Sequence, residues 1–211
     1  LLSKMAKKHC TVILTGEGAD ELFAGYPQYR FMMLHQKLLR PFPQTLRKAG
    51  ANIVTALPSV VLNKAFSFAS ALGQKGKERF KKFACAHSFA EQYLQQVALF
   101  NQEEQVALLG KKKEIYPSYQ EKYFTDKKST LLGECQRLDF KESMVDDLLM
   151  KLDKNAMTFA IEGRVPFIDG RIMNLSMKLP DTYKMCGRNN KILLRSAVKD
   201  LLPKQTAQRK K

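Results

Sequence analysis

The amino-acid sequence predicts an α/β fold that is mostly α-helical and has about one parallel strand. The strand is expected at residues 11–15, an apolar, β-branched run followed by glycines. Such a run is typical of a strand buried on both faces of a parallel sheet. Most of the other residues in the 211-residue chain show the apolar spacing of helices. Because a lone strand needs neighbours, we expect partner strands in sequence that is not present here.

Residues 11–26 are predicted to form a strand, a glycine-containing turn and the start of a helix. The helix is expected to begin near Ala19, which places Asp20 and Glu21 close to its positive end. Two acidic side chains in a first turn favour helix formation there. This strand–turn–helix unit is the first region in which we expect a functional site.

Residues 27–128 are predicted to be a helical region that serves packing or specificity, because it contains few motifs. A Ser followed three residues later by Glu is the sequence pattern of a capping box at a helix start. The capping signals are Ser88 with Glu91, Ser118 with Glu121, and Asn101 before a short helix through Leu109.

Residues 129–211 form the third region, in which helices are again expected. Helix is predicted over residues 129–162 and must be broken before Pro166, because proline disfavours α conformation in the preceding residue. Asp169 is placed to cap a following helix that runs through Lys178. A last helix is expected over about residues 190–202.

Composition excludes several classes of protein. The chain is 45% hydrophobic and 27% charged, which is ordinary for a globular protein, and it has no apolar run of about 20 residues that could span a membrane. Lys and Arg number 36 against 20 Asp and Glu, a net charge of +16. The basic residues are scattered and do not alternate with aromatics, so we expect a solvated basic surface and no specific nucleic-acid binding.

The cysteines and histidines give no metal-site or disulfide pattern. The four cysteines are far apart in sequence, which fits free thiols in a reducing compartment and therefore a cytoplasmic protein. No histidine has metal-ligand spacing to another, and we expect no catalytic role for them. The residues concerned are Cys10, Cys85, Cys135, Cys186, His9, His35 and His87.

The strongest candidate site is the acidic glycine turn at residues 15–21, which reads T-G-E-G-A-D-E. Gly16 and Gly18 would let backbone N–H groups approach an anion at a strand-to-helix junction. The acids suit such a site if Asp20 binds a divalent cation beside phosphate, or if one carboxylate is a general base. The alternative is a purely structural turn that Asp20 caps.

A second candidate lies at residues 153–169. Glu162 and Arg164 are two positions apart, so on a helix they would not face each other, and each is expected to reach a different partner. Arg164 is a candidate to grip a carboxylate or phosphate with two hydrogen bonds. The structural alternative is an ion-pair network of Glu162, Arg164 and Asp169 that holds a loop.

A third candidate is the pair Lys191 and Arg195, four residues apart on one expected helix face. Two cations on one face repel each other unless an anion lies between them, and a phosphate would serve. The alternative is a solvated basic face.

Taken together, these segments resemble the synthetase domain of the glutamine-dependent asparagine synthetase family. The family pattern S-G-E-G-(S/A)-D-E-(L/V)-F-x-G-Y is matched at residues 15–26 by T-G-E-G-A-D-E-L-F-A-G-Y. The family block D-R-x-S-M-A-x-S-x-E-x-R-x-P-F-L-D resembles residues 153–169, where Lys154 replaces Arg and Ala156 replaces Ser. The block K-x-x-L-R, followed by L-P and a basic pair, matches from Lys191 onward.

The resemblance implies that residues 1–211 are the C-terminal portion of the asparagine synthetase domain, of the adenine-nucleotide-hydrolase-like (ATP-pyrophosphatase) fold. The family's S-G-G-x-D-(S/T) loop, which binds ATP, has no match, because no two of the eleven glycines are adjacent. An N-terminal glutaminase domain with its leading catalytic Cys is also absent. The 211 residues alone are therefore expected to be inactive.

The reaction implied by the resemblance is ATP-dependent amide formation by a ligase. Aspartate is activated as an acyl-adenylate with release of pyrophosphate, and ammonia from glutamine then attacks to give asparagine and AMP. The cofactors and partners implied are ATP, Mg²⁺, aspartate, ammonia from glutamine and a glutaminase domain outside this chain.

The resemblance also assigns roles to residues that match the motifs. Glu17 corresponds to a catalytic glutamate that helps the amine lose a proton, and Asp20 to an aspartate that binds Mg²⁺ and pyrophosphate. Lys191 corresponds to a lysine that stabilises charge on the α-phosphate. The residues expected to line or support the ATP and pyrophosphate site are Thr15, Gly16, Gly18 and Arg164.

Two alternatives remain open. A related amide-forming enzyme that closes a β-lactam or a macrolactam would keep the adenylation chemistry and use a different amine. A catalytically incomplete basic binding remnant would explain the missing loop and the charge of +16, but it would not need acidic residues in a glycine turn.

Overall fold

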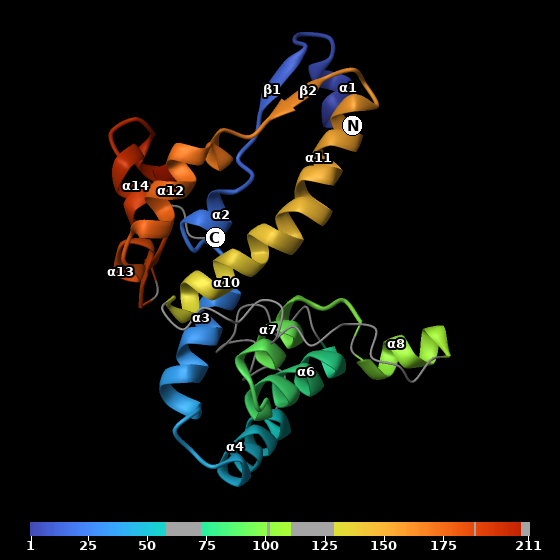
Figure 1. The fold of residues 1–211 in the computed structure, drawn as a ribbon, viewed down its shortest axis with the longest axis vertical. Helices are drawn as coiled ribbons and strands as arrows, with labels where there is room; N and C mark the ends of the chain where they lie inside the picture. Colours follow the sequence, from blue (N-terminus) through green and yellow to red (C-terminus); the bar gives the residue numbers. More distant parts are fainter. Residues whose placement is uncertain (58–72, 101, 111–128, 188, 208–211) are drawn as a thin grey trace. The chain divides into compact units, whose positions relative to one another are not determined.

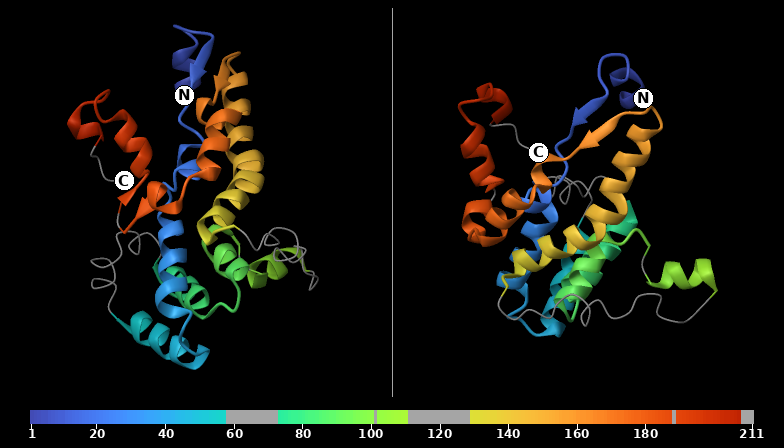
Figure 2. Two further views of the ribbon diagram at one scale, coloured as in Figure 1. Left: turned by 60° about the vertical axis from the view of Figure 1, so that its left-hand side comes forward. Right: turned by 45° about the horizontal axis from the view of Figure 1, so that its top comes forward.

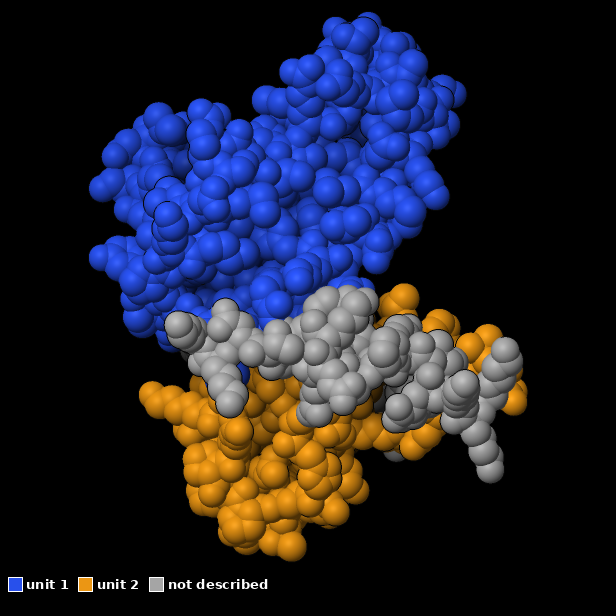
Figure 3. All heavy atoms as spheres, viewed as in Figure 1, with its two compact units in different colours: residues 1–30, 128–211 blue, residues 31–127 orange. Residues whose placement is uncertain are grey.

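The computed structural model describes residues 1–57, 73–100, 102–110, 129–187 and 189–207, and it divides into two compact units. Unit 1 contains residues 1–30 and 128–211, and unit 2 contains residues 31–127 (Figure 3). The expected capping residues Ser118, Glu121 and Asn101 lie outside the described residues.

Unit 1 is built around a small parallel sheet of strands β1 (Val12–Leu14) and β2 (Glu162–Arg164). Val12 pairs with Glu162 and Leu14 with Arg164, so segments 150 residues apart in sequence lie side by side (Figure 1). The α/β character and the mostly helical content are confirmed. The expectation of about one parallel strand is wrong, because β2 is a second one.

The predicted burial of the first strand on both faces is also wrong. Leu14 is 72% exposed and Val12 38% exposed, and these two residues point to the same face of the sheet. The central residue Ile13 is half-buried and lies opposite Gly163, which contacts Leu152 of helix α11 (Met150–Met157). One face of this sheet is therefore covered by α11, as Figure 2 shows.

The predicted helix over residues 129–162 ends earlier than expected. It consists of α10 (Leu131–Asp139), a π-helical segment η3 (Phe140–Leu149) and α11. Ala160 then takes a left-handed conformation with φ of 51°, and the amide of Glu162 donates to the carbonyl of Thr11. The chain turns here into β2, because a left-handed residue cannot continue a right-handed helix.

The remaining elements of unit 1 are short and follow the two strands. Asp169 caps α12 as predicted, since its side chain accepts a hydrogen bond from the amide of Arg171. The last predicted helix, over about 190–202, is shorter than expected, because α14 begins after Lys191 and ends at Val198. The elements are α1 (Leu2–Ala6), α2 (Ala19–Leu22), the 3₁₀ turn η4 (Pro166–Ile168), α12 (Gly170–Lys178), α13 (Asp181–Lys184), the antiparallel strands β3 (Met185–Cys186) and β4 (Asn189–Asn190), α14 (Ile192–Val198) and α15 (Lys204–Ala207).

Unit 2 is a helical cluster that continues from α3 (Pro27–Leu34), the helix in which the two units join. Its described elements are the π-helical turn η1 (His35–Leu39), α4 (Gln44–Ala56), α6 (Gly73–Cys85), α7 (Phe89–Val97) and α8 (Gln102–Leu109). The capping signal at Ser88 is confirmed, because its side chain accepts from the amide of Glu91. The Glu91 carboxylate accepts from the amide of His87, one residue before the cap.

His35 is a buried structural residue of unit 2, only 2% exposed. Its ring lies 3.1 Å from the carbonyl of Ala84 and 2.8 Å from the amide nitrogen of Gln92. It also packs edge-on against Phe83. Burial lowers the pKa of His35 from its usual 6.5, and the nearby Arg47 acts in the same direction.

Acidification below about pH 6 is expected to destabilise unit 2 through His35. The unfolded chain then binds a proton that the folded chain excludes, so the stability present above the ordinary pKa of 6.5 is lost as the pH falls. Thermal melting at about pH 7.5 and pH 5.5 measures this, with His35→Asn as the comparison. An equal drop in melting temperature in both proteins would contradict the assignment.

The four cysteines are all free thiols. Burial raises the pKa of the Cys135 thiol well above its usual value, with the nearby Asp139 carboxylate acting in the same direction. Among the described residues, no helix is long and apolar enough to cross a membrane.

Candidate active site

The turn between β1 and α2 is held against the segment that follows β2. The amide of Thr15 donates to the carbonyl of Arg164 at 2.9 Å. Gly18 is buried in a left-handed conformation with φ of 88°, and a Cβ there would lie 2.7 Å from Cγ2 of Ile168. Phe23 packs edge-on against Phe167, with ring centroids 6.4 Å apart. Two of the three sequence motifs are thus in contact.

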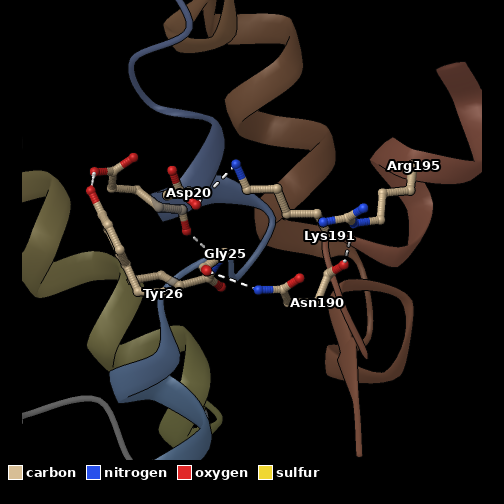
Figure 4. A network of polar contacts seen from close by, with 8 residues as sticks. Asp20, Gly25, Tyr26, Asn190, Lys191 and Arg195 are labelled. Atoms are coloured by element: carbon tan, nitrogen blue, oxygen red, sulfur yellow. Dashed lines mark hydrogen bonds and ion pairs between the residues drawn. The ribbon is translucent and has the colours of Figure 1, made fainter. Parts of the chain in front are cut away.

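The segment after α2 brings in the third motif. Asn190 donates its side-chain amide to the carbonyl of Gly25 at 2.9 Å, and the amide of Lys191 donates to the carbonyl of Phe23 at 3.1 Å (Figure 4). The amide of Gly25 in turn donates to the carbonyl of Asp20 at 2.8 Å. One side-chain and one backbone hydrogen bond therefore join motifs that are about 165 residues apart in sequence.

The centre of this network is an ion pair between Asp20 and Lys191. Nζ of Lys191 lies 2.9 Å from Oδ1 of Asp20, and the side chains are only 19% and 22% exposed, respectively. Figure 4 shows the Lys191 side chain extended toward the Asp20 carboxylate. A half-buried pair of this kind is screened less by water than a surface pair.

Lys191 is presented by an unusual backbone. It is the residue before α14 and adopts the left-handed conformation, with φ of 51° and ψ of 36°. A left-handed non-glycine residue costs about 1–2 kcal/mol, and such strain persists where surrounding contacts fix it. The contacts of Asn190 and Lys191 with the loop after α2 supply this restraint. A positive φ at a lysine was not predictable from the sequence.

Arg195 lies four residues after Lys191, and a phosphate held between these two cations stays a prediction. Nε of Arg195 donates to the carbonyl of Asn190 at 3.2 Å, and the Arg195 amide donates to the carbonyl of Lys191. The anion that offsets Lys191 in this structure is Asp20. Arg195 closes the turn from which Lys191 projects.

Two further carboxylates of unit 1 are buried. Glu21 is 1% exposed and accepts a 2.5 Å hydrogen bond from the hydroxyl of Tyr26. Asp139 is 2% exposed and accepts a very short hydrogen bond from the hydroxyl of Tyr29. Burial, reinforced by these carboxylates, raises the pKa of both tyrosines. Neither tyrosine ionises near neutral pH, so each stays a hydrogen-bond donor.

The prediction that Glu162 and Arg164 reach different partners is wrong, because both lie on a strand. Residues two apart on a strand point to the same face, and Nε of Arg164 lies 2.8 Å from Oε1 of Glu162. This exposed pair lowers the pKa of Glu162 through the hydrogen bond. Among the described residues, no hydrogen bond or ion pair joins the Arg164 side chain to Asp20 or Lys191.

The predicted three-residue network with Asp169 is likewise not formed. Asp169 pairs instead with Arg171, with 2.9 Å between Oδ1 and Nε. This hydrogen bond lowers the pKa of Asp169, and the backbone amide of Arg171 adds to the effect. Asp169 thus serves the start of α12.

The other predicted site residues lie on the turn itself. Glu17 is half-buried, and among the described residues its carboxylate has no hydrogen-bond or ion-pair partner. Oγ1 of Thr15 is buried without a hydrogen-bond partner in the described structure. A Cβ at Gly16 would meet nothing within 4 Å. The turn therefore contains a buried hydroxyl without a partner among the described residues, a half-buried carboxylate and open backbone at Gly16.

The donor set around Asp20 suits one kind of metal site. No group of three or more His, Cys, Asp or Glu side chains among the described residues could hold an ion by itself. Mg²⁺ commonly binds through one or two carboxylates together with substrate phosphates. Asp20 fits that pattern, in which phosphate oxygens complete the coordination.

Sequence reasoning missed the residues that support this site. Gln136, Ser176 and Lys184 are buried and contact α2 or one another, yet each lies in a helix without a motif. Gly25 and Asn190 lie inside or beside the motifs, and only the three-dimensional contacts reveal their roles.

These observations define a class: an α/β domain in which a strand–turn–helix unit places an aspartate against a lysine that lies far away in sequence, directly before α14. The asparagine synthase family model matches residues 1–211, and the chain belongs to this family. No solved structure matches it.

Curated relatives agree with the family. The chain is 32% identical over 219 residues to "Asparagine synthetase (glutamine-hydrolyzing) 1" of Bacillus subtilis (strain 168). It is 30% identical over 223 residues to "Putative asparagine synthetase (glutamine-hydrolyzing)" of Mycobacterium bovis and of Mycobacterium tuberculosis. Each match covers 100% of this chain and 30% or 31% of the relative. The chain therefore spans about a third of the length of these proteins.

Proposed function

We propose that this chain supplies one wall of the active site of an ATP-dependent ligase that makes asparagine from aspartate. The observation that carries the proposal is the 2.9 Å contact between Asp20 and Lys191, which unites the acidic turn with the lysine motif. Family membership and the names of the relatives support the same reaction. The proposed fold of the complete domain is that of the ATP-pyrophosphatases.

In the first step, a carboxylate oxygen of aspartate attacks the α-phosphorus of ATP, and the bond to pyrophosphate breaks. Lys191 lies where its charge would offset the negative charge that develops on the phosphate. Asp20 would hold Mg²⁺, which when bound neutralises charge on the phosphates. Thr15, Gly16 and Gly18 would line the nucleotide site with a hydroxyl and backbone N–H groups.

In the second step, the nitrogen of ammonia attacks the acyl carbon, and the bond from that carbon to AMP breaks. The attacking nitrogen must lose a proton, and Glu17 is the proposed acceptor. Arg164 is proposed to support the site through the strand pairing of β2 with β1. Ammonia would come from glutamine through a glutaminase domain outside this chain, in a cytoplasmic protein.

The test is aspartate-dependent exchange of labelled pyrophosphate into ATP by the full-length protein that carries this chain. We expect exchange with aspartate and Mg²⁺, and asparagine once ammonia or glutamine is added. Exchange that requires a different carboxylate, followed by ring closure onto an internal amine, would instead identify a lactam-forming ligase. The 211 residues alone are expected to make no asparagine.

A further inference from the structure

The short helix α2, which carries Asp20, accepts hydrogen bonds from a cluster of buried side chains. Lys184, at the end of α13, is 2% exposed, and its Nζ donates to Oε1 of Gln136 at 2.8 Å. Gln136 of α10 is completely buried. Burial lowers the pKa of Lys184, while the nearby Asp181 opposes that shift.

The orientation of the Gln136 amide follows from this contact. A lysine ammonium can only donate, so the oxygen of Gln136 must face Lys184 and its NH₂ must face away. The NH₂ group then donates to the carbonyl of Leu22 at 2.8 Å and, over a very short distance, to that of Glu21. Ser176 of α12 donates its hydroxyl to the same Leu22 carbonyl at 2.6 Å.

These contacts compensate for a weakness of α2. An isolated helix of four residues is not stable, because the free-energy cost of nucleating the helix exceeds the gain from the hydrogen bonds of one turn. Its last carbonyls also lack partners within the helix, and burial would leave them unsatisfied. Gln136 and Ser176 provide those partners, and Lys184 fixes the side chain that provides two of them.

We propose that Gln136 and Lys184 are positioning residues that set the place of Asp20 opposite Lys191. The proposal rests on the proposed function for the role of Asp20, but the clamp itself does not. It assigns to a buried lysine outside the sequence motifs the task of orienting one side-chain amide. The side-chain amide of Gln136 fixes the C-terminal end of α2. Asp20, near the other end of the helix, is thereby held in position to bind its ligands.

The test uses Gln136→Glu, which keeps an acceptor for Lys184 and replaces the NH₂ donor with a carboxylate oxygen that repels the two carbonyls. Lys184→Met is the milder second variant, since it keeps both donors of Gln136 and removes only their anchor. Thr130→Ala is the matched control. It removes the side-chain cap of α10 and the contact of Thr130 with Asp181 in α13, so it loosens the same two helices without touching α2.

Two measurements separate the clamp from the proposed function. The first is hydrogen exchange of the full-length protein at the amides of Leu22, Phe23, Gly25 and Lys191, which are all bonded within or to the α2 segment. We expect hydrogen exchange at these amides to be at least about tenfold faster in Gln136→Glu, and to change less in Lys184→Met. The second is the Mg²⁺ concentration for half-maximal pyrophosphate exchange, expected to rise about tenfold while the KM for aspartate changes less.

Faster exchange at these amides together with the higher Mg²⁺ requirement supports the proposal. Unchanged rates of amide hydrogen exchange in both variants overturn the proposal. An equally large increase of these rates in Thr130→Ala also overturns it, because it would show general loosening of the structure. Faster amide hydrogen exchange with an unchanged Mg²⁺ requirement also overturns the proposal, because Gln136 and Lys184 would then not position Asp20. A wild-type protein without pyrophosphate exchange would refute the proposed function, while the amide measurement would still decide the clamp.

Discussion

Replacing Lys191 by Met is expected to slow aspartate-dependent pyrophosphate exchange by about 100- to 1,000-fold, the usual loss when one group that stabilises transition-state charge is removed. Methionine keeps the length of the side chain and loses the ammonium that lies 2.9 Å from Asp20. The loss is expected mainly in kcat, because the charge it offsets grows as the phosphorus is attacked. The assay is performed on the full-length protein.

Lys199→Met is the control for this variant. Lys199 follows α14 directly and is exposed, so its replacement removes the same charge from the same region without touching the site. Its exchange rate should stay within about twofold of the parent protein. If Lys191→Met retained the parent rate, the 2.9 Å pair would be structural and the proposed role of Lys191 would be wrong.

The parts of the fold that the sequence predicts are those with local causes. The side chain of Asp169 caps α12 at the predicted residue, and Ser88 caps α7, because capping depends on neighbouring residues. Strand β2 was missed because Glu162, Gly163 and Arg164 have no apolar alternation. Only pairing with β1, distant in sequence, makes them a strand.

The same distinction separates the predicted from the missed parts of the site. Asp20 stands out as an acid in a glycine turn, and Lys191 as a cation four residues before Arg195. The structure brings Asp20 and Lys191 into contact. The expected helix ends at Glu162, so the sequence favours different partners for Glu162 and Arg164, which pair with each other on β2. Nothing in the local sequence marks Gln136, whose importance comes from two carbonyls more than 100 residues away.

The Gly25→Ala variant is expected to lose pyrophosphate exchange by about 100-fold or more, because a displacement near 1 Å at a catalytic group has an effect of this size. A Cβ at position 25 would overlap Oδ1 of Asp20 and Cε of Lys191, and would lie 2.8 Å from Cγ of Asp20. Gly25 has no positive φ, so alanine suits the backbone and the added methyl group alone accounts for the effect.

The overlap forces the two charged side chains apart, and it should also lower stability by about 1–3 kcal/mol, as overpacking does. Gly50→Ala is the matched control, because a Cβ there meets nothing within 4 Å and alanine favours helix α4 by about 0.5–1 kcal/mol. Thermal melting and the exchange assay on both variants distinguish lost positioning from lost folding.

The double variant Gly25→Ala with Lys191→Met tests whether Gly25 acts through the ion pair. Groups that work as a unit show strongly non-additive losses, so the double variant should be slower than Lys191→Met by less than about tenfold. A full product of the two single losses would mean that Gly25 makes room for something other than the pair. The methyl group would then displace nucleotide bound at the open turn around Gly16, and the apparent KM for ATP would rise. If the methyl group disturbs only the ion pair, the apparent KM for ATP stays unchanged.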